Sequence, residues 1–328
     1  MITIIRYVCK PKRFGSWCAV INRPSVLGSV RQYSVHPVEK AVSKTILDIQ
    51  RKYTLKQPIT MCTAYDYISA NWVQKSNSDM LLIGDSMAMT TLGYASTTEL
   101  PFEEFKYHVK SVCRANGSSL IVADLPFGSF EASHEQAINN AIEIMKLTSK
   151  VTSVKIESGT LKNDEYTIEL IGKLCSRGIP VIGHIGLTPQ RSNTLGGFKV
   201  QANKSIEDMQ DLVNTAVALE KAGCWSLLLE CIPAHLAGHI TKTVNIPTIG
   251  IGAGNQTSGQ VLVVSDILGM QDGRVPKFVN KYTNLNETAI GSIFKYISDV
   301  ESKVFPDAQK HSFSVKDHLW EQFIKDKI

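Results

Sequence analysis

The chain has 328 residues, of which 43% are hydrophobic and 20% charged, with 22 glycines and 12 prolines. This composition is typical of a globular protein with a large core, and it excludes a collagen, a mucin-like stalk and a mainly disordered chain. The formal net charge is +5. No apolar run reaches the roughly 18 residues of a membrane-spanning helix, so we expect no membrane partner.

The positive charge is concentrated at the N-terminus. Residues 1–38 contain six basic residues and no acidic one, and the rest of the chain has 29 basic and 30 acidic residues, a charge of −1. A basic, acid-free leader that contains serine is typical of a mitochondrial transit peptide. The string RQYS (Arg31 to Ser34) resembles a matrix-protease cleavage site. We therefore predict a transit peptide at 1–33, a single mature domain at 34–328 and a location in the mitochondrial matrix.

A basic arm that binds nucleic acid is the alternative interpretation of this leader. The remainder of the chain offers no second basic patch to continue such a surface. We therefore expect small-molecule substrates and no nucleic-acid partner.

Short apolar runs of strand length recur along the rest of the chain and are mostly apolar on both faces. In chain order they are ITMCTA (from Ile59), MLLIG (from Met80), SLIVA (from Ser119), SVKI (from Ser153), PVIG (from Pro180), SLLL (from Ser226) and PTIGIG (from Pro247), with ILGM (from Ile267) as a weaker eighth candidate.

Helical patterns lie between these runs. One helix is predicted at about 103–115, a second begins with a capping box formed by Ser133 and Gln136, and a third covers about 206–222 and ends at Gly223. Seven or eight strand–helix alternations predict a parallel sheet, either open and doubly wound or closed into a barrel. No G-x-G-x-x-G follows the first run, and the length suits a barrel. We therefore predict an α/β fold, a (β/α)8 TIM barrel with a C-terminal helical extension.

Polar side chains follow the apolar runs, and in a barrel all these strand ends meet at the C-terminal face, where active sites lie. Lys155 and Glu157 are two residues apart, so both point to one side of their strand. An inward lysine in an apolar strand is costly unless it is paired or binds a ligand. The residues in this set are Asp85, Ser86, Asp124, Lys155, Glu157, His184 and Glu230.

Each residue of this set has a structural alternative when taken alone. Asp85 or Asp124 could cap a helix, Glu157 could serve only as the partner of Lys155, and His184 could be a hydrogen-bonded core histidine. Glu230 follows three leucines and has no local partner in the sequence. A chance origin for the whole set is much less probable than for any one member, so the constellation favours a functional site.

The three carboxylates Asp85, Asp124 and Glu157 would repel one another without a neutralising cation. Hard oxygen ligands select Mg²⁺, which takes one or two carboxylates together with water and substrate oxygens. These residues are therefore the candidate metal ligands, directly or through water. A 2-oxo acid could complete the shell with its keto and carboxylate oxygens, and Lys155 would hold that anion.

The cysteines and the last glycine-rich segment point to less specific roles. The cysteines after the leader form no C-x-x-C pair and show no zinc spacing, so we expect buried thiols. In IGIGAGN (from Ile249), a tight turn that permits close backbone packing is favoured over a phosphate site.

Ten motifs resemble those of the ketopantoate hydroxymethyltransferase family, in order and without large gaps from about Ile59 to Phe313. They are TAYDY, GDSMAMT, ADLPFGS, VKIES, GHIGLTPQ, GGFKVQ, LLECIP, IGIGAGN, GRVPKF and HSF. The resemblance implies a barrel related to the phosphoenolpyruvate mutase and isocitrate lyase group, assembled as a homo-oligomer, usually a decamer. It also implies Mg²⁺, 5,10-methylenetetrahydrofolate as co-substrate and 3-methyl-2-oxobutanoate as acceptor, in the first committed step of pantothenate synthesis.

By the same resemblance, Asp85 and Asp124 lie at the metal and the substrate, and Glu157 is the third metal carboxylate. Lys155 contacts the oxo acid, Ser86 hydrogen-bonds the substrate carboxylate, and His184 lies near the substrate. Glu230 is implied as the general base, and we expect its leucine neighbours to desolvate its carboxylate. The nearest rival is another Mg²⁺-dependent lyase or mutase of this barrel group, against which the strings GHIGLTPQ and GGFKVQ argue.

Overall fold

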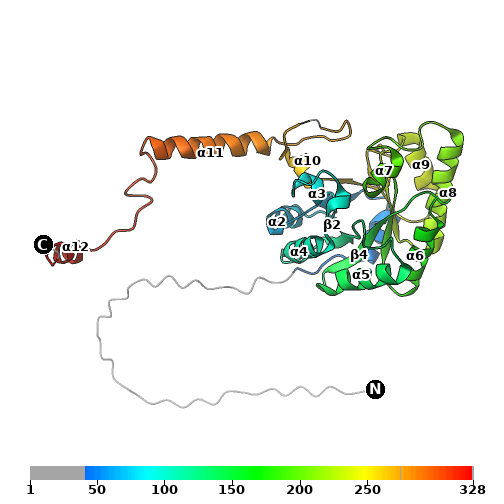
Figure 1. Ribbon diagram of the computed structural model, residues 1–328, viewed down its shortest axis with the longest axis horizontal. Helices are drawn as coiled ribbons and strands as arrows, with labels where there is room; N and C mark the ends of the chain where they lie inside the picture. Colours follow the sequence, from blue (N-terminus) through cyan, green and yellow to red (C-terminus); the bar gives the residue numbers. More distant parts are fainter. Residues whose placement is uncertain (1–40, 274, 327–328) are drawn as a thin grey trace, which may run out of the picture. The chain divides into compact units, whose positions relative to one another are not determined.

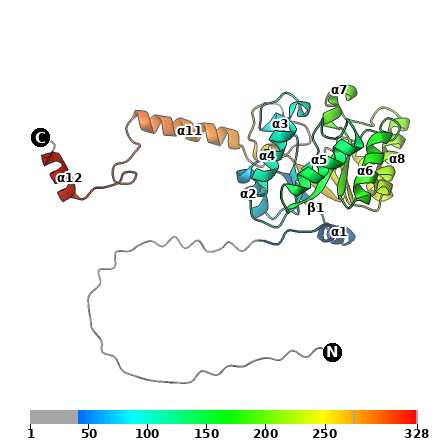
Figure 2. The same cartoon turned by 60° about the horizontal axis from the view of Figure 1, so that its bottom comes forward.

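The computed structural model describes residues 41–273 and 275–326, so the predicted leader lies outside the described residues. Eight parallel strands close into a barrel in sequence order, with β8 paired to β1. Helices lie around the outside of these strands, as α5, α6 and α8 do in Figures 1 and 2. The strands are β1 (Ile59–Thr63), β2 (Met80–Ile83), β3 (Leu120–Asp124), β4 (Val151–Glu157), β5 (Val181–Gly186), β6 (Ser226–Glu230), β7 (Thr248–Ile251) and β8 (Gly259–Leu262).

The helices include the crossover helices of the barrel, several short turns and a C-terminal extension. None that the structure describes is both long and apolar enough to cross a membrane. They are α1 (Ile46–Thr54), α2 (Tyr67–Lys75), α3 (Met87–Thr90), α4 (Phe102–Val112), α5 (His134–Lys146), α6 (Glu165–Ser176), α7 (Ser192–Leu195), α8 (Ile206–Ala222), α9 (Ala234–Thr243), α10 (Val264–Leu268), α11 (Leu285–Glu301) and α12 (Asp317–Lys325), with 3₁₀ turns η1 (Thr97–Glu99) and η2 (Pro189–Arg191).

The barrel and its first seven strands are confirmed, but the predicted eighth strand at ILGM is wrong. That string lies at the end of α10 and in the turn after it, whereas β8 begins eight residues earlier, at Gly259. Gly259 packs so closely on β1 that an added Cβ would lie 2.4 Å from the carbonyl oxygen of Ile59. Gln260 is exposed on the outer side. A glycine and an exposed polar residue leave β8 without the apolar run that identified the other strands.

The helix boundaries follow local capping chemistry. The hydroxyl of Ser133 accepts the backbone N–H of Gln136 at 3.0 Å, as a capping box requires. The return bond differs, because the side-chain Oε1 of Gln136 accepts from the N–H of Ala132 rather than from that of Ser133. Helix α8 ends at Gly223, whose φ of +106° is a left-handed conformation that glycine adopts without strain.

Two apolar layers fill the fold. The larger lies between the strands and the surrounding helices, and the smaller fills the barrel interior with side chains that include Met80, Leu120 and Trp225. Ile49 of α1 belongs to the interior cluster and is fully buried, so α1 closes the N-terminal end of the barrel. The interior is therefore a packed core at that end, and only its C-terminal end is available for polar chemistry.

The cysteine prediction is confirmed in part. Cys113 and Cys224 are buried free thiols, whereas Cys62, Cys175 and Cys231 are free but only half-buried. Burial raises the pKa of the Cys113 thiol to about 12, so this thiol stays protonated at neutral pH.

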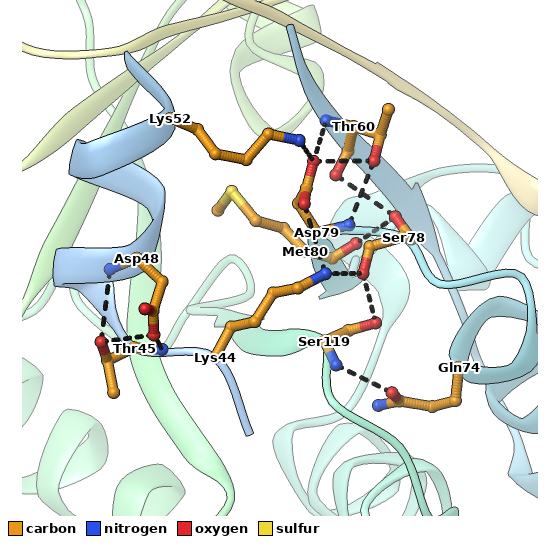
Figure 3. A network of polar contacts seen from close by, with 10 residues as sticks. All are labelled: Lys44, Thr45, Asp48, Lys52, Thr60, Gln74, Ser78, Asp79, Met80 and Ser119. Atoms are coloured by element: carbon orange, nitrogen blue, oxygen red, sulfur yellow. Dashed lines mark hydrogen bonds and ion pairs between the residues drawn. The ribbon is translucent and has the colours of Figure 1, made fainter. Parts of the chain in front are cut away.

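An ion-pair network centred on Asp79 joins α1 to β1 and β2 (Figure 3). The Lys52 ammonium lies 2.6 Å from one carboxylate oxygen of Asp79 and the Lys44 ammonium 3.2 Å from the other. The backbone N–H and the hydroxyl of Thr60 both donate to the same carboxylate at 3.0 Å. Burial raises the pKa of Asp79, but the donors from Lys52 and Thr60 outweigh it, so the pKa is lowered.

Replacing Asp79 with asparagine is expected to lower the free energy of unfolding by about 1–3 kcal/mol at neutral pH, because two partly buried ammonium groups lose their partner. A carboxylate whose folded pKa is lowered stabilises the fold above its unfolded pKa of 3.8 and loses that contribution as pH falls through the folded value. The difference from wild type should therefore shrink below about pH 4. Urea unfolding at a fixed protein concentration measures both effects. The exposed pair Lys295–Asp299 provides the control, Asp299→Asn, for which a loss as large as that of Asp79→Asn would contradict the prediction.

Candidate active site

All seven site residues predicted from the sequence line one cavity of about 220 Å³ at the C-terminal end of the barrel. They are Asp85, Ser86, Asp124, Lys155, Glu157, His184 and Glu230. The carboxylates thus converge on one cavity, as the argument for a shared cation required.

The alternation of strand side chains explains this convergence. Leu120 and Val122 belong to the interior cluster, so the next residue of the same parity, Asp124, also faces inward. In β5 the inward positions include Ile182 and His184, and in β6 they include Leu228 and Glu230. The parallel register then places Asp124 beside Lys155 and Glu157 beside His184. In β3, β5 and β6 the inward row thus passes from an apolar residue to the polar side chain at the cavity.

Lys155 is the cation that the structure places among the carboxylates. Its ammonium lies 3.1 Å from Asp124 Oδ1 and 4.0 Å from Glu157 Oε1, and its side chain is 5% exposed. Burial lowers the pKa of Lys155, but the surrounding carboxylates outweigh it and raise the pKa, so the amine stays protonated. The backbone N–H of Asp85 donates to Asp124 Oδ2 at 2.9 Å, which joins the end of β2 to β3.

One ammonium does not neutralise three carboxylates, and the pKa values respond accordingly. Burial, together with the charges of Asp124 and Glu157, raises the pKa of Asp85 well above its usual range. Burial also raises the pKa of Asp124, against the opposing effect of Lys155. The pKa of Glu157 is lowered instead, because contacts with His184 and Lys155 outweigh its burial. Additional positive charge in the cavity would therefore stabilise the ionised carboxylates.

His184 connects this cluster to Glu230. Its Nδ1 lies 3.5 Å from Glu157 Oε1 and its Nε2 lies 3.2 Å from Glu230 Oε2. Burial and the charge of Lys155 lower the pKa of His184, but the two glutamates outweigh them and raise it to about 9. The Lys155 ammonium also lies 3.2 Å from Nδ1, so the ring is held between two carboxylates and an ammonium.

Glu230 is less enclosed than its leucine neighbours suggested. Leu227 and Leu229 are fully buried, whereas the Glu230 side chain, at the end of β6, is 17% exposed. Gly186, the last residue of the neighbouring strand β5, packs on the Glu230 backbone: its φ is +97°, and a Cβ there would lie 2.2 Å from the Glu230 carbonyl oxygen. Glu230 thus combines a fixed backbone with a carboxylate that opens on the cavity.

Ser86 lies at the wall formed by β1 and β2. Its hydroxyl is 2.9 Å from the hydroxyl of Tyr65, which is itself buried. Burial raises the pKa of Tyr65 to about 12, so the phenol keeps its proton and can donate it to Ser86. The Ser86 hydroxyl can then donate its own hydrogen to an anionic ligand in the cavity.

The remaining walls of the cavity are mostly apolar. Phe198 and Phe278 approach from loops, and Leu228, Ile251 and Val261 come from the strands. A small ligand that combines an anionic oxygen cluster with a short aliphatic branch matches these two kinds of lining.

The structural alternatives for single residues are now decided in part. Asp85 does not cap α3, because the N-cap is Ser86 and no side chain caps that helix. Helix α5, the first after Asp124, is capped by Ser133. Glu157 does lie near Lys155, but it also faces His184 and Gln190. His184 is a buried, hydrogen-bonded histidine whose partners are the candidate catalytic groups themselves.

Sequence reasoning did not single out two residues that contact this set, Tyr65 and Gln190. Gln190 donates to Asp85 Oδ2 at 2.7 Å from its side chain and to Glu157 Oε2 at 2.9 Å from its backbone. Gln190 follows no apolar run, so the pattern that found the others could not find it, whereas Tyr65 directly follows ITMCTA and was not selected. Both fall within the motifs TAYDY and GHIGLTPQ, which was the available signal.

The donor set can be tested against the implied Mg²⁺ ion. Across 41–273 and 275–326, no three His, Cys, Asp or Glu side chains are grouped as a metal site. Direct ligation of one ion by Asp85, Asp124 and Glu157 together therefore stays a prediction. Asp124 Oδ1 is buried with the Lys155 ammonium 3.1 Å away, and all the candidate ligand atoms are hard oxygens. This set fits an ion that takes one or two carboxylates directly and the rest of its shell from water and substrate.

The glycines after β7 make a tight turn, as expected. Gly254 has a φ of +76°, and a Cβ there would lie 2.4 Å from the Cβ of Ala234. The segment therefore needs glycine for close packing on α9.

Comparison with known proteins gives matches along most of the chain. The family model of ketopantoate hydroxymethyltransferase matches residues 43–308. The 3-methyl-2-oxobutanoate hydroxymethyltransferase of Saccharomyces cerevisiae is 56% identical over 280 residues, which is 85% of this chain and 90% of that protein. The enzyme of the same name from Carboxydothermus hydrogenoformans is 43% identical over 278 residues, 85% of this chain and 98% of that protein.

Solved structures support the fold. Phosphonopyruvate hydrolase, in a complex with oxalate and Mg²⁺, superimposes with a TM-score of 0.53 at 11% identity, covering 87% of this chain and 96% of that one. A 2,3-dimethylmalate lyase described as a member of the PEP mutase/isocitrate lyase superfamily gives 0.50 at 12% identity, covering 86% and 98%. The barrel type expected from the sequence is thus confirmed. With the cavity residues in place and the family model matched over 43–308, the chain belongs to the ketopantoate hydroxymethyltransferase family.

Proposed function

We propose that the cavity transfers a hydroxymethyl group from 5,10-methylenetetrahydrofolate to 3-methyl-2-oxobutanoate and forms ketopantoate for pantothenate biosynthesis. One observation carries this proposal. The cavity contains both a cluster of carboxylates around Lys155, suited to bind a cation and an oxo acid, and a separate carboxylate, Glu230. Such a pairing suits proton abstraction next to a keto group. The relatives in the same family act, by their names, on 3-methyl-2-oxobutanoate.

We infer that Asp85, Asp124 and Glu157 would hold a Mg²⁺ ion, directly or through water, as their convergence on one buried cavity and the mutual repulsion of their charges suggest. When bound, the ion supplies positive charge beside the keto oxygen, where negative charge develops during enolate formation. The chain itself holds the oxo acid in place. The Lys155 ammonium attracts its carboxylate, and the Ser86 hydroxyl, supported by Tyr65, donates a hydrogen bond to it.

Glu230 then takes the proton from C3 of the oxo acid. The electron pair of that C–H bond forms the C2=C3 bond of the enolate, and the carbonyl electrons move to the keto oxygen. His184, 3.2 Å from Glu230 Oε2, fixes the carboxylate in the orientation that faces the cavity. The apolar walls around Leu228 and Ile251 accommodate the aliphatic branch at C3 and limit access of water.

The enolate carbon C3 forms the new carbon–carbon bond with the one-carbon unit of methylenetetrahydrofolate. Both bonds from that carbon to the folate nitrogens N5 and N10 break, one as the carbon–carbon bond forms and the other as the oxygen of a water molecule bonds to the carbon. The proton taken from C3 and one proton of the water go to the two nitrogens. The products are ketopantoate and tetrahydrofolate, so no oxidant or reductant is required.

A product assay tests this function together with its metal. With 3-methyl-2-oxobutanoate, methylenetetrahydrofolate and Mg²⁺, we expect ketopantoate and tetrahydrofolate in equal amounts. Omission of the folate should prevent turnover, and excess chelator should abolish it until Mg²⁺ is restored. A lyase or mutase of the same barrel group would instead consume an oxo acid without folate, and that outcome would reject the proposal.

The leader and the location extend the proposal beyond the described residues. We propose that 1–33 is a mitochondrial transit peptide, that 34–328 is the mature single domain, and that the matrix is the site of action. The acid-free, basic composition of 1–38 supports this. A mature protein that still begins at Met1 in purified mitochondria would reject it.

The family resemblance also leads us to propose a homo-oligomer, with a decamer as the expected form. The described helices α11 and α12 are consistent with association between subunits, because they contain no buried residue yet carry large apolar side chains. Among these, Ile293 is 59% exposed, Phe294 75% and Trp320 52%. Light scattering coupled to size-exclusion chromatography of the mature chain measures the subunit number.

A further inference from the structure

Gln190 lies in the turn η2, in the loop after β5, and contacts the ends of three strands of the barrel. Its backbone N–H donates to Glu157 Oε2 at 2.9 Å, at the end of β4. Its side-chain amide donates to Asp85 Oδ2 at 2.7 Å, after β2, and to the carbonyl oxygen of Leu125 at 3.0 Å, after β3. The residue is 4% exposed, so these bonds form away from bulk water. One neutral side chain thus contacts two of the three candidate metal carboxylates.

The orientation of this amide is determined by its partners. Asp85 Oδ2 and the Leu125 carbonyl both accept hydrogen bonds, so the NH₂ group must face them and its two hydrogens are both used. A flipped amide would place its oxygen against two other oxygens. The Gln190 Oε1 atom is buried and has no hydrogen-bond partner within the described chain. The residue therefore keeps an unsatisfied acceptor, at a cost in stability, in order to present two donors.

Asp85 depends on Gln190 more than its neighbours do. Asp124 and Glu157 each have Lys155 within 4.0 Å, whereas no ion pair of Asp85 occurs among the described residues. The side-chain hydrogen bond to the Asp85 carboxylate comes from Gln190. Gln190 donates one hydrogen bond to Asp85 Oδ2 and one to Glu157 Oε2. The second oxygen of each carboxylate, Asp85 Oδ1 and Glu157 Oε1, receives no hydrogen bond from Gln190.

The turn that contains Gln190 is itself anchored. Arg191 forms an ion pair with Asp164, which caps α6 and also accepts the N–H of Gly159 at 2.8 Å. The loop after β4 and the turn after β5 are thereby joined on the outer side of the cluster. This anchoring limits the freedom of the Gln190 backbone and fixes its approach to the carboxylates.

We propose that Gln190 is a positioning residue that holds one oxygen of Asp85 and one of Glu157 so that their other oxygens can take a divalent cation. This inference rests on the proposed Mg²⁺ site. A neutral double donor is required at this position, because a charged donor would compete with the cation and an acidic residue would add to the repulsion. Partners that orient ligating carboxylates typically contribute 10–100-fold to metal affinity.

The test is the affinity of the full chain for Mn²⁺, a paramagnetic probe for Mg²⁺, measured from the free-ion signal by electron paramagnetic resonance. Gln190→Met keeps the length and the backbone donor but removes the amide, and should weaken binding about 10–100-fold. Gln190→Asn keeps an amide on a side chain that is one methylene too short, so it should weaken Mn²⁺ binding by a similar factor. This variant provides the test if Gln190→Met does not fold. Gln210→Met, on the exposed face of α8, is the matched control and should bind as wild type does.

The outcomes separate this inference from the proposed function. If wild type binds Mn²⁺ and a folded Gln190 variant binds it within about twofold of wild type, the positioning role is rejected and the metal site stands. If wild type itself binds no Mn²⁺, the metal site fails and the inference fails with it. Selective loss in the Gln190 variants, with urea unfolding of the metal-free protein close to that of Gln210→Met, supports the proposal, since a merely structural role would lower stability first.

Discussion

Replacement of Glu230 by glutamine is expected to slow exchange of the C3 proton of 3-methyl-2-oxobutanoate by about 10²–10⁴-fold, the usual contribution of a general base. The amide has nearly the same shape as the carboxylate and can still contact His184, which lies 3.2 Å from Glu230 Oε2. It cannot accept a proton from carbon. Oxo-acid binding should be retained, because Lys155 and Ser86 are unchanged. Proton NMR in D₂O, with Mg²⁺ and without folate, follows the exchange directly.

The control for this experiment is Glu169→Gln, the same change on the exposed face of α6, where Glu169 pairs with Lys173. That variant should exchange the C3 proton at the wild-type rate. Undiminished exchange in Glu230→Gln would remove Glu230 from its role as base and direct attention to another group in the cavity. Loss of oxo-acid binding in the same variant would mean that Glu230 binds the substrate, so the two measurements have to be made together.

The strands were predictable because a buried parallel strand leaves a simple trace in the sequence. Met80 to Ile83 is buried at every position, and the same is true of Leu120 to Asp124. The last strand leaves no such trace, since Gly259 packs against β1 without a side chain and Gln260 points to solvent. Its pairing with β1 is a closure contact between residues some 200 positions apart, for example Met61 with Val261. Local periodicity has no access to that contact.

The site was predictable for a related reason. Asp124 and Glu230 end apolar strands, and His184 lies two residues before the end of β5. All three have the parity of the inward side chains, so strand geometry alone places them in one cavity. Gln190 lies in a 3₁₀ turn whose direction depends on the anchoring of Arg191 by Asp164. A turn of this kind has no periodic signal. The pairing of His184 with Glu230 also required coordinates, because it depends on which rotamers the two side chains adopt across the barrel mouth.

Replacement of Lys155 by methionine should destabilise the fold more than any other single change in the cavity. The ammonium is 5% exposed and lies 3.1 Å from Asp124, so its removal leaves that buried carboxylate without its ion-pair partner. Removing one partner of a buried ion pair typically costs about 3–5 kcal/mol. Methionine is close in volume, so the loss reports charge rather than a cavity. Urea unfolding at a fixed protein concentration near pH 8, in chelator, measures it.

The pH dependence of that variant distinguishes a charge effect from a packing defect. The pKa values of Asp85 and Asp124 are already raised in the fold by burial, and loss of Lys155 removes a charge that lowers them. A carboxylate whose folded pKa exceeds its unfolded value binds more protons when folded, so it stabilises the fold increasingly as pH falls. The free energy of unfolding of Lys155→Met should therefore approach that of wild type as pH is lowered from about 8 to 5.

Lys173→Met is the matched control, because Lys173 is 38% exposed on α6 and pairs with Glu169 across one helical turn. Surface pairs of this kind contribute about 0.2–1 kcal/mol, so the control should stay near wild type at every pH. A deficit in Lys155→Met that is independent of pH would show that the lysine stem packs the barrel mouth and that its charge is not what the carboxylates need. A loss in the free energy of unfolding that becomes smaller as pH falls would instead show that Asp85, Asp124 and Glu157 repel one another when ionised. A divalent cation would relieve that repulsion.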